Sequence, residues 1–177
     1  MRSQMKHIAR VTAALTLAIS ASACGGPSVD GTWYQENGTT PLPEKICSGG
    51  CLLDVEATMA FDDQAKSFQL TLNMAYTALH DSLIAHGAYE IEGEDMTLTF
   101  DGFTIDPASG NKASVDADGA QCIVLKGFAS TTVCFPSPQT DTFTLGGDRL
   151  TLKLENVIAG AQISQTTLDM QRQEASK

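Results

Sequence analysis

The stretch FQLTLNMAY, residues 68–76, decides the fold, because apolar and polar side chains alternate along its whole length. A period of two puts the two kinds of side chain on opposite faces of a β-strand. The stretch before it, LDVEATMAF at residues 53–61, alternates in the same way, and Asp62-Asp63 begins the turn between them. Strands with one buried and one polar face are typical of antiparallel sheets, so the sequence predicts an all-β fold.

Two later segments repeat one pattern, YEIEGEDMTLTF at residues 89–100 and FTLGGDRLTLKL at residues 143–154. Each alternates, reaches a turn with glycine and acidic residues, and alternates again. We expect Gly93 and Gly147 to supply the positive φ that a tight hairpin needs. The sequence therefore predicts two β-hairpins.

Shorter strands are predicted elsewhere, at residues 32–34, 122–125, 128–135 and 166–172. Asn37-Gly38 and Lys126-Gly127 are predicted turns, and residues 106–119, rich in Gly, Ser, Asn and Asp, are a predicted loop. Residues 76–86 fit either a short helix or two strands around a turn at Asp81-Ser82, and we favour the strands. Residues 159–161 are left open.

The N-terminus has the pattern of an export signal. Basic residues at 2, 6 and 10 precede a short apolar run at residues 11–19, and only small residues lead from there to Cys24. The run is shorter than the ~20 residues that a membrane-spanning helix needs. It resembles a bacterial lipoprotein signal, which implies cleavage before Cys24 and fatty acyl chains such as palmitate on that cysteine. The alternative is ordinary secretion.

The predicted organisation follows from that signal: a signal peptide (1–23), a lipidated linker (24–30) and one domain (31–173). The part after the signal holds 154 residues, with 8 Lys and Arg against 21 Asp and Glu. This excess of negative charge disfavours binding to nucleic acid and direct docking on anionic lipid headgroups. We expect localisation in the bacterial cell envelope, lipid-anchored; Gly25 after the cysteine favours the outer membrane by the same resemblance.

Four cysteines remain after Cys24, and an even number in an oxidising compartment favours two disulfides. We favour Cys47–Cys51, which closes a short Gly-rich loop, and Cys122–Cys134, which flanks the Lys126-Gly127 turn. The other pairings stay open. A zinc site is the alternative, although the cysteine spacings differ from the usual C-x2-C.

The first strand carries Gly31-Thr32-Trp33, which resembles the G-x-W of lipocalin-type barrels. Residues 87–98 are similar to a hairpin that recurs in bacterial lipocalin-like lipoproteins, and residues 167–172 fit the last strand. The resemblance implies an antiparallel up-and-down meander that closes into a lipocalin-like barrel of about eight strands. It also implies that Arg172 stacks on Trp33.

We expect a binding module for a small apolar ligand, with Tyr76 or Tyr89 as a polar handle. The alternative is a filled barrel that meets a protein partner, for example as an envelope-enzyme inhibitor, through loop 38–51 or loop 106–119. The predicted ligand lining is Phe68, Leu70, Leu72, Met74, Tyr89, Ile91, Met96 and Leu98.

Catalytic and metal sites receive little support from the sequence. His80 and His86 could join Asp81 in a metal site, but exposed or structural histidines are the favoured interpretation. Residues 116–119 slightly resemble a calcium-binding loop, but a simple Asp-Gly turn is favoured there. The chain has no G-x-S-x-G, H-E-x-x-H or Gly-rich phosphate loop. We therefore expect no enzyme, no metal and no cofactor.

Overall fold

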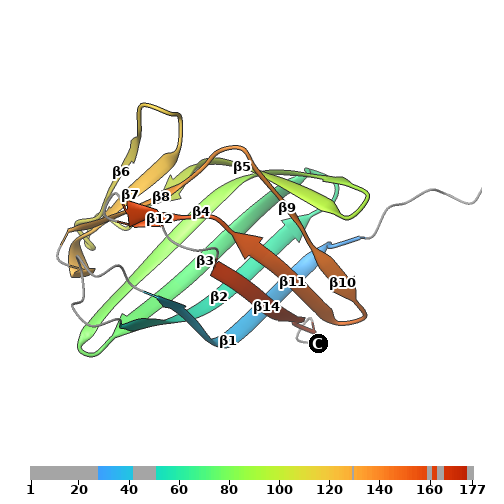
Figure 1. The fold of residues 1–177 in the computed structure, drawn as a ribbon, viewed down its shortest axis with the longest axis horizontal. Helices are drawn as coiled ribbons and strands as arrows, with labels where there is room; N and C mark the ends of the chain where they lie inside the picture. Colours follow the sequence, from blue (N-terminus) through green and yellow to red (C-terminus); the bar gives the residue numbers. More distant parts are fainter. Residues whose placement is uncertain (1–27, 42–50, 129, 159–160, 163–165, 175–177) are drawn as a thin grey trace, which may run out of the picture.

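The computed structural model describes residues 28–41, 51–128, 130–158, 161–162 and 166–174. These residues form two antiparallel sheets and one turn of 3-10 helix (Figure 1). Their elements are β1 (Gly31–Pro41), β2 (Leu52–Asp62), β3 (Ser67–Tyr76), β4 (Leu79–Glu92), β5 (Asp95–Thr104), β6 (Lys112–Val115), β7 (Gln121–Leu125), η1 (Lys126–Phe128), β8 (Thr131–Phe135), β9 (Gln139–Thr142), β10 (Thr144–Gly146), β11 (Arg149–Leu154), β12 (Val157–Ile158), β13 (Ala161–Gln162) and β14 (Thr166–Arg172).

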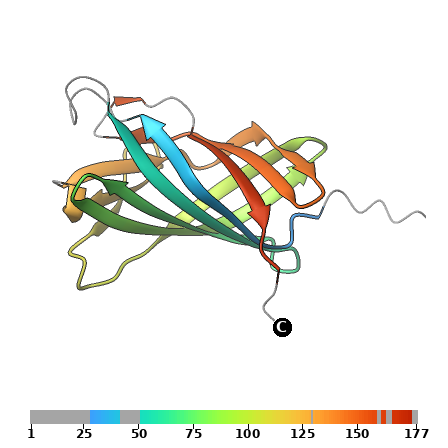
Figure 2. The same ribbon diagram turned by 90° about the horizontal axis from the view of Figure 1, so that it is seen from below.

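The larger sheet has the order β10-β11-β14-β1-β2-β3-β4-β5-β9 and curls into a nearly closed barrel (Figure 2). Its two edges, β9 and β10, are consecutive in the chain, with only Phe143 between them. The chain itself therefore joins the two edges, and the amide of Phe143 extends the pairing of β9 with β5 by donating to the carbonyl of Glu94 at 3.0 Å. With β9 and β10 taken as one bent strand, the barrel has about eight strands in meander order, as predicted.

Alternation along the strands makes the core. In β2 and β3 every second side chain is buried, and paired residues such as Ala57 and Leu72 bring these buried positions opposite each other. A chain of aromatic contacts runs through the interior, with ring centroids 5.0 to 5.2 Å apart. The pairs are Phe61–Tyr89, Phe68–Phe100 and Phe100–Phe135.

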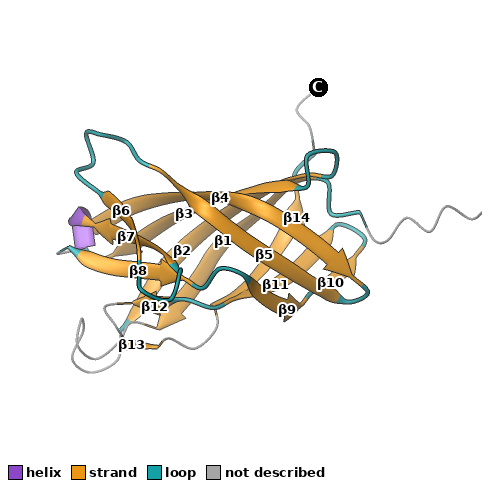
Figure 3. Ribbon diagram, turned by 90° about the horizontal axis from the view of Figure 1, so that it is seen from above, coloured by secondary structure: helices purple, strands orange, loops and turns teal. Residues whose placement is uncertain are grey.

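The smaller sheet has the order β13-β12-β8-β7-β6 and lies at one end of the barrel (Figure 3). Val133 and Phe135 of β8 are buried in the same core as the barrel strands. Asp81 of β4, in the same row as the buried Val55 and Met74, fastens this sheet to the barrel: its carboxylate accepts hydrogen bonds from Asn111 Nδ2 at 3.0 Å and from the Gly127 amide at 3.2 Å. These contacts place the inserted segment between β5 and β9 firmly on the barrel end.

Three local predictions are wrong. Asn37-Gly38 is not a turn: it lies inside β1, where the register with β2 shifts and Asn37 has φ 61°. Asp81-Ser82 lies inside β4, and the chain turns earlier, around Thr77 with φ 54°. The predicted loop at 106–119 contains β6, which pairs with β7 although none of its side chains is buried.

Most strand predictions are confirmed. The two hairpins form as β4–β5 and β10–β11, with Gly93 at φ 66° and Gly147 at φ 61°. The last strand spans residues 166–172 as predicted. Among the described residues no helix has the length and hydropathy that crossing a bilayer requires.

Candidate functional site

The eight residues predicted to line a ligand all point into the barrel core. Ile91 is half-buried there, and the other seven are buried. Their neighbours are protein side chains: Phe68, for example, packs edge-on against Phe100. The structure thus brings the predicted set together as packed core.

Both predicted polar handles contact protein groups. The Tyr89 hydroxyl donates to Asp63, which also accepts a hydrogen bond from Ser28 at 2.7 Å and pairs with Lys66 at 3.5 Å. The bonds from Tyr89 and then Ser28 lower the pKa of Asp63, whereas burial, and then the bond to Asp63, raises the pKa of Tyr89. The Tyr76 hydroxyl lies 3.0 Å from Cys51 Sγ.

A small cavity of ≈ 30 Å³ lies inside the barrel, near the end that β8 and β12 cover. Its walls include Leu72 and Met74 from the predicted lining and three polar residues. Asn156 Nδ2 donates to Thr166 Oγ1 at 2.9 Å, and Thr166 Oγ1 lies 3.2 Å from Thr40 Oγ1. Asn156 is 8% exposed, and its Oδ1 has no hydrogen-bond partner among the described residues. Such a space holds one or two water molecules.

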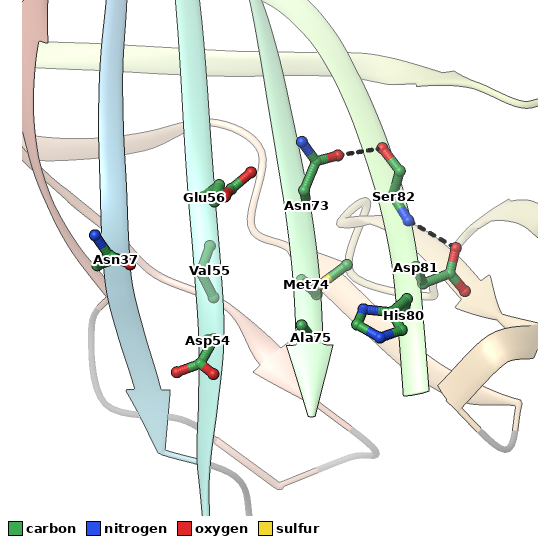
Figure 4. A pocket seen from close by; sticks show the side chains of 10 residues that line it. All are labelled: Asn37, Asp54, Val55, Glu56, Asn73, Met74, Ala75, His80, Asp81 and Ser82. Atoms are coloured by element: carbon green, nitrogen blue, oxygen red, sulfur yellow. Dashed lines mark hydrogen bonds between the residues drawn. The ribbon is translucent and has the colours of Figure 1, made fainter. Parts of the chain in front are cut away.

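A larger hollow, of ≈ 720 Å³, lies on the outer face of the barrel (Figure 4). We call it the outer groove; it is lined by Asn37, Asp54, Val55, Glu56, Asn73, Met74, Ala75, His80, Asp81 and Ser82. Strand register explains the hollow. One row across β2, β3 and β4 is Asp54, Ala75 and His80, so the smallest side chain lies between two larger ones.

The second row of the outer groove is Glu56, Asn73 and Ser82. Ser82 Oγ donates to Asn73 Oδ1 at 2.9 Å, which fixes the amide of Asn73 with its NH₂ group turned away from Ser82 (Figure 4). The groove thus presents carboxylates, an amide and an imidazole on a rigid sheet. The carboxylates bind cations and hydrogen-bond donors, and the amide NH₂ of Asn73 is a hydrogen-bond donor.

The electrostatic setting of the groove is strongly negative. Strands β1 to β5 carry no Lys or Arg, while they hold acidic residues on every strand except β3. Tyr34 pairs with Thr58 next to the groove, and its pKa is raised first by burial and then by the charges of Glu56 and Glu36. A positively charged partner is therefore attracted to this face.

The remaining candidates lie apart from one another. His80 is in the outer groove, while His86 pairs with Gln69 and lies six residues further along β4. Cys122 and Cys134 are joined in the predicted disulfide, so their sulfurs are not thiolate ligands, although Asp116 lies close to them. Cys24 and Cys47 lie outside the described residues, so lipidation and the Cys47–Cys51 pairing stay predictions.

Trp33 and Arg172 meet at the other end of the barrel. The guanidinium carbon of Arg172 lies 4.4 Å from the centroid of the Trp33 ring, and the two residues are opposite each other on β1 and β14. Trp33 Nε1 donates to the Val29 carbonyl at 2.7 Å, and Arg172 Nη1 donates to the Asp30 carbonyl at 2.8 Å. This cluster holds the start of the domain against the last strand.

Comparison with protein-family models, with curated proteins and with solved structures gives no match for this chain. The site must therefore be judged from its own geometry. Sequence reasoning did not select the groove residues Asp54, Glu56, Asn73 and Ala75. A usable signal was present, because they occupy the outward positions of the same alternation that identified the core, and no basic residue stands among them.

Proposed function

We propose that this protein is a membrane-anchored interaction module of the bacterial cell envelope, a filled barrel that binds a protein partner on its outer face. The anchor would be lipid on Cys24. Support comes from the interior, where the predicted ligand lining packs on itself and the described cavity is ≈ 30 Å³. Ligand pockets are typically several hundred Å³.

The observation that carries the proposal is the outer groove, an open hollow whose lining includes the carboxylates of Asp54 and Glu56. Asp54 and Glu56 stand on one side and His80 on the other, about the width of two strands away. A Lys or Arg side chain of a partner fits between them, and the Asn73 amide offers a carbonyl of the same partner a donor. We expect the affinity to fall with salt, because exposed charges are screened.

Site-specific cross-linking in the envelope tests this proposal. A photoreactive residue at position 73 should give one discrete adduct, and the same residue at Thr99, exposed on β5, should give none. Asp54→Asn with Glu56→Gln should abolish the adduct, whereas Glu90→Gln with Glu92→Gln, the same charge change elsewhere on the barrel, should preserve it. Equal adducts from positions 73 and 99 would refute the groove as the binding site.

Binding of a small apolar ligand inside the barrel is the second candidate. The observation that favours it is Asn156, whose buried Oδ1 has no partner among the described residues and whose side chain lines a mostly apolar cavity beside Thr40 and Thr166. A ligand with one hydrogen-bond donor would satisfy this oxygen. Asn156→Leu should then reduce the ligand's retention while leaving the groove adduct unchanged.

A further inference from the structure

The edge strand of the smaller sheet, β6, is a second surface that the proposed function does not use. Among the described residues β6 is the last strand of that sheet and pairs on one side only, with β7. All four of its side chains are exposed, and Val115, at 60%, is one of two large apolar side chains exposed to this degree among the described residues. The hairpin projects from the body of the molecule (Figure 1). Such an edge can accept another strand.

The hydrogen-bond pattern shows which backbone groups are free. The Asp116 amide donates back to the Ala120 carbonyl at 3.0 Å, so Asp116 faces β7. Because facing alternates along an antiparallel strand, Lys112 and Ser114 also face β7, while Ala113 and Val115 turn their N–H and C=O groups outward. The cross-strand partner of Ser114 is Cys122, whose disulfide to Cys134 holds β7 on β8.

We propose that β6 pairs with β6 of a second copy of this chain, antiparallel and centred on Ser114. In this register Ala113 of each copy forms a hydrogen-bonded pair with Val115 of the other, which uses the outward groups of both strands. Lys112 of each copy then stands opposite Asp116 of the other, giving two reciprocal ion pairs in an isologous contact.

Charge selects this register over its neighbours. Centring on Ala113 places Lys112 opposite Ser114, and centring on Val115 places Ser114 opposite Asp116, so both lose the direct pairs. Within the described residues neither Lys112 nor Asp116 forms an ion pair of its own. Asp116 keeps one carboxylate oxygen for its own turn, where Oδ1 accepts from the amides of Asp118 and Ala120, and Oδ2 remains for the partner.

The expected dimer is weak, because two four-residue strands bury less than the 1,200–2,000 Å² of a stable interface; a dissociation constant on the order of 0.1–1 mM is expected. Sedimentation of the full exported chain carrying Cys24→Ser, from 10 μM to 1 mM, is the test. Lys112→Glu should weaken association at least about tenfold, since attraction becomes repulsion at both pairs. Lys153→Glu, the same change on β11, should leave it unaltered.

The register is tested separately by NMR on a mixture of isotope-labelled and unlabelled protein. Contacts between the copies should join Ser114 to Ser114 and Lys112 to Asp116. Asp116→Asn, which retains the turn acceptor but not the charge, should weaken the dimer without unfolding the hairpin. A chain that stays monomeric at 1 mM, or that associates equally well with Lys112→Glu, would overturn the proposal, as would contacts between the copies at another surface.

Discussion

Tyr89 carries a hydroxyl to the end of an apolar barrel, where Asp63 accepts its hydrogen bond. The tyrosine ring packs on Phe61, and Lys66 lies 5.3 Å above the ring centroid. Ser28, at the start of the described domain, binds the other oxygen of the same carboxylate. Asp63 thus links Tyr89 of the core, the β2–β3 turn and the segment that leads back to Cys24.

Replacing Tyr89 by Phe should destabilise the fold by about 1 kcal/mol at pH 7, the usual contribution of such a bond. Because the bond lowers the pKa of Asp63, its stabilisation is complete above the unfolded pKa of about 3.9 and is lost as the pH falls through the lower folded-state pKa. Urea unfolding at pH 7 and at about pH 2.5 measures this. Tyr34→Phe is the control. An equal loss at both pH values would contradict the assignment.

Arg172→Ala should cost about 1 to 2 kcal/mol, because it removes both the stacking on Trp33 and the bond to the Asp30 carbonyl. Arg149→Ala is the matched control: its pair with Asp169 is 2.6 Å long but exposed, and such pairs contribute less than about 1 kcal/mol. Denaturant midpoints compare the two. A larger effect at Arg149 would show that the Trp33 cluster is not the stabilising contact.

At the scale of elements, the β4–β5 pair depends on a glycine at its register shift. A side chain on Gly87 would place Cβ 2.0 Å from the Thr99 carbonyl oxygen, a backbone atom that cannot move freely. Gly87→Ala should therefore destabilise the protein by about 3 kcal/mol. Gly146→Ala on β10, where nothing lies within 4 Å, should change stability by less than about 0.5 kcal/mol. Thermal melting of both variants distinguishes a local clash from a general intolerance of alanine.

The strands could be predicted where alternation is unbroken, as in residues 53–61 and 68–76, because period two directly encodes one buried face. The prediction failed where geometry overrides local chemistry. Asn37-Gly38 has the composition of a turn, yet it forms a bulge because the chain continues along β2. Thr77 turns the chain at a positive φ that threonine rarely adopts.

The candidate site was harder to predict than the fold. All four side chains of β6 are exposed, so no buried face marks it in the sequence, and it forms because the β7–β8 pair offers it an edge. The outer groove depends on which residues of three strands share a row, and that register is a tertiary property. The inward set was predicted correctly as a face, but alternation cannot tell a packed interior from a hollow one.

On the scale of the whole molecule, the contacts of Ser28 give the proposed anchor a direction. Ser28 is four positions after Cys24 in the sequence, a reach of about 14 Å when extended. Ser28 binds the β2–β3 turn, whereas the outer groove and the smaller sheet lie at the end of the β3–β4 turn. Lipid on Cys24 would hold the first end near the bilayer and present the groove and β6 away from it.

Headgroup-attached spin labels in vesicles that carry the lipidated protein test this orientation. Relaxation should be much stronger for a reporter at Gln64, in the β2–β3 turn, than for one at Ala78, in the β3–β4 turn. Cys24→Ser should move the protein from the membrane to the soluble fraction without changing its melting temperature. Equal relaxation at both turns would contradict a fixed orientation, and membrane retention of Cys24→Ser would contradict the lipid anchor.

The central claim is that this barrel is filled and acts through its outer surface. Native mass spectrometry of the Cys24→Ser protein, purified gently from its own envelope extract, tests it most directly. The account predicts the bare mass of the chain, less two hydrogens for each disulfide, even after exposure to envelope lipids. A reproducible added mass that is lost on denaturation and reduced by Asn156→Leu would contradict it, and would make ligand binding inside the barrel the function.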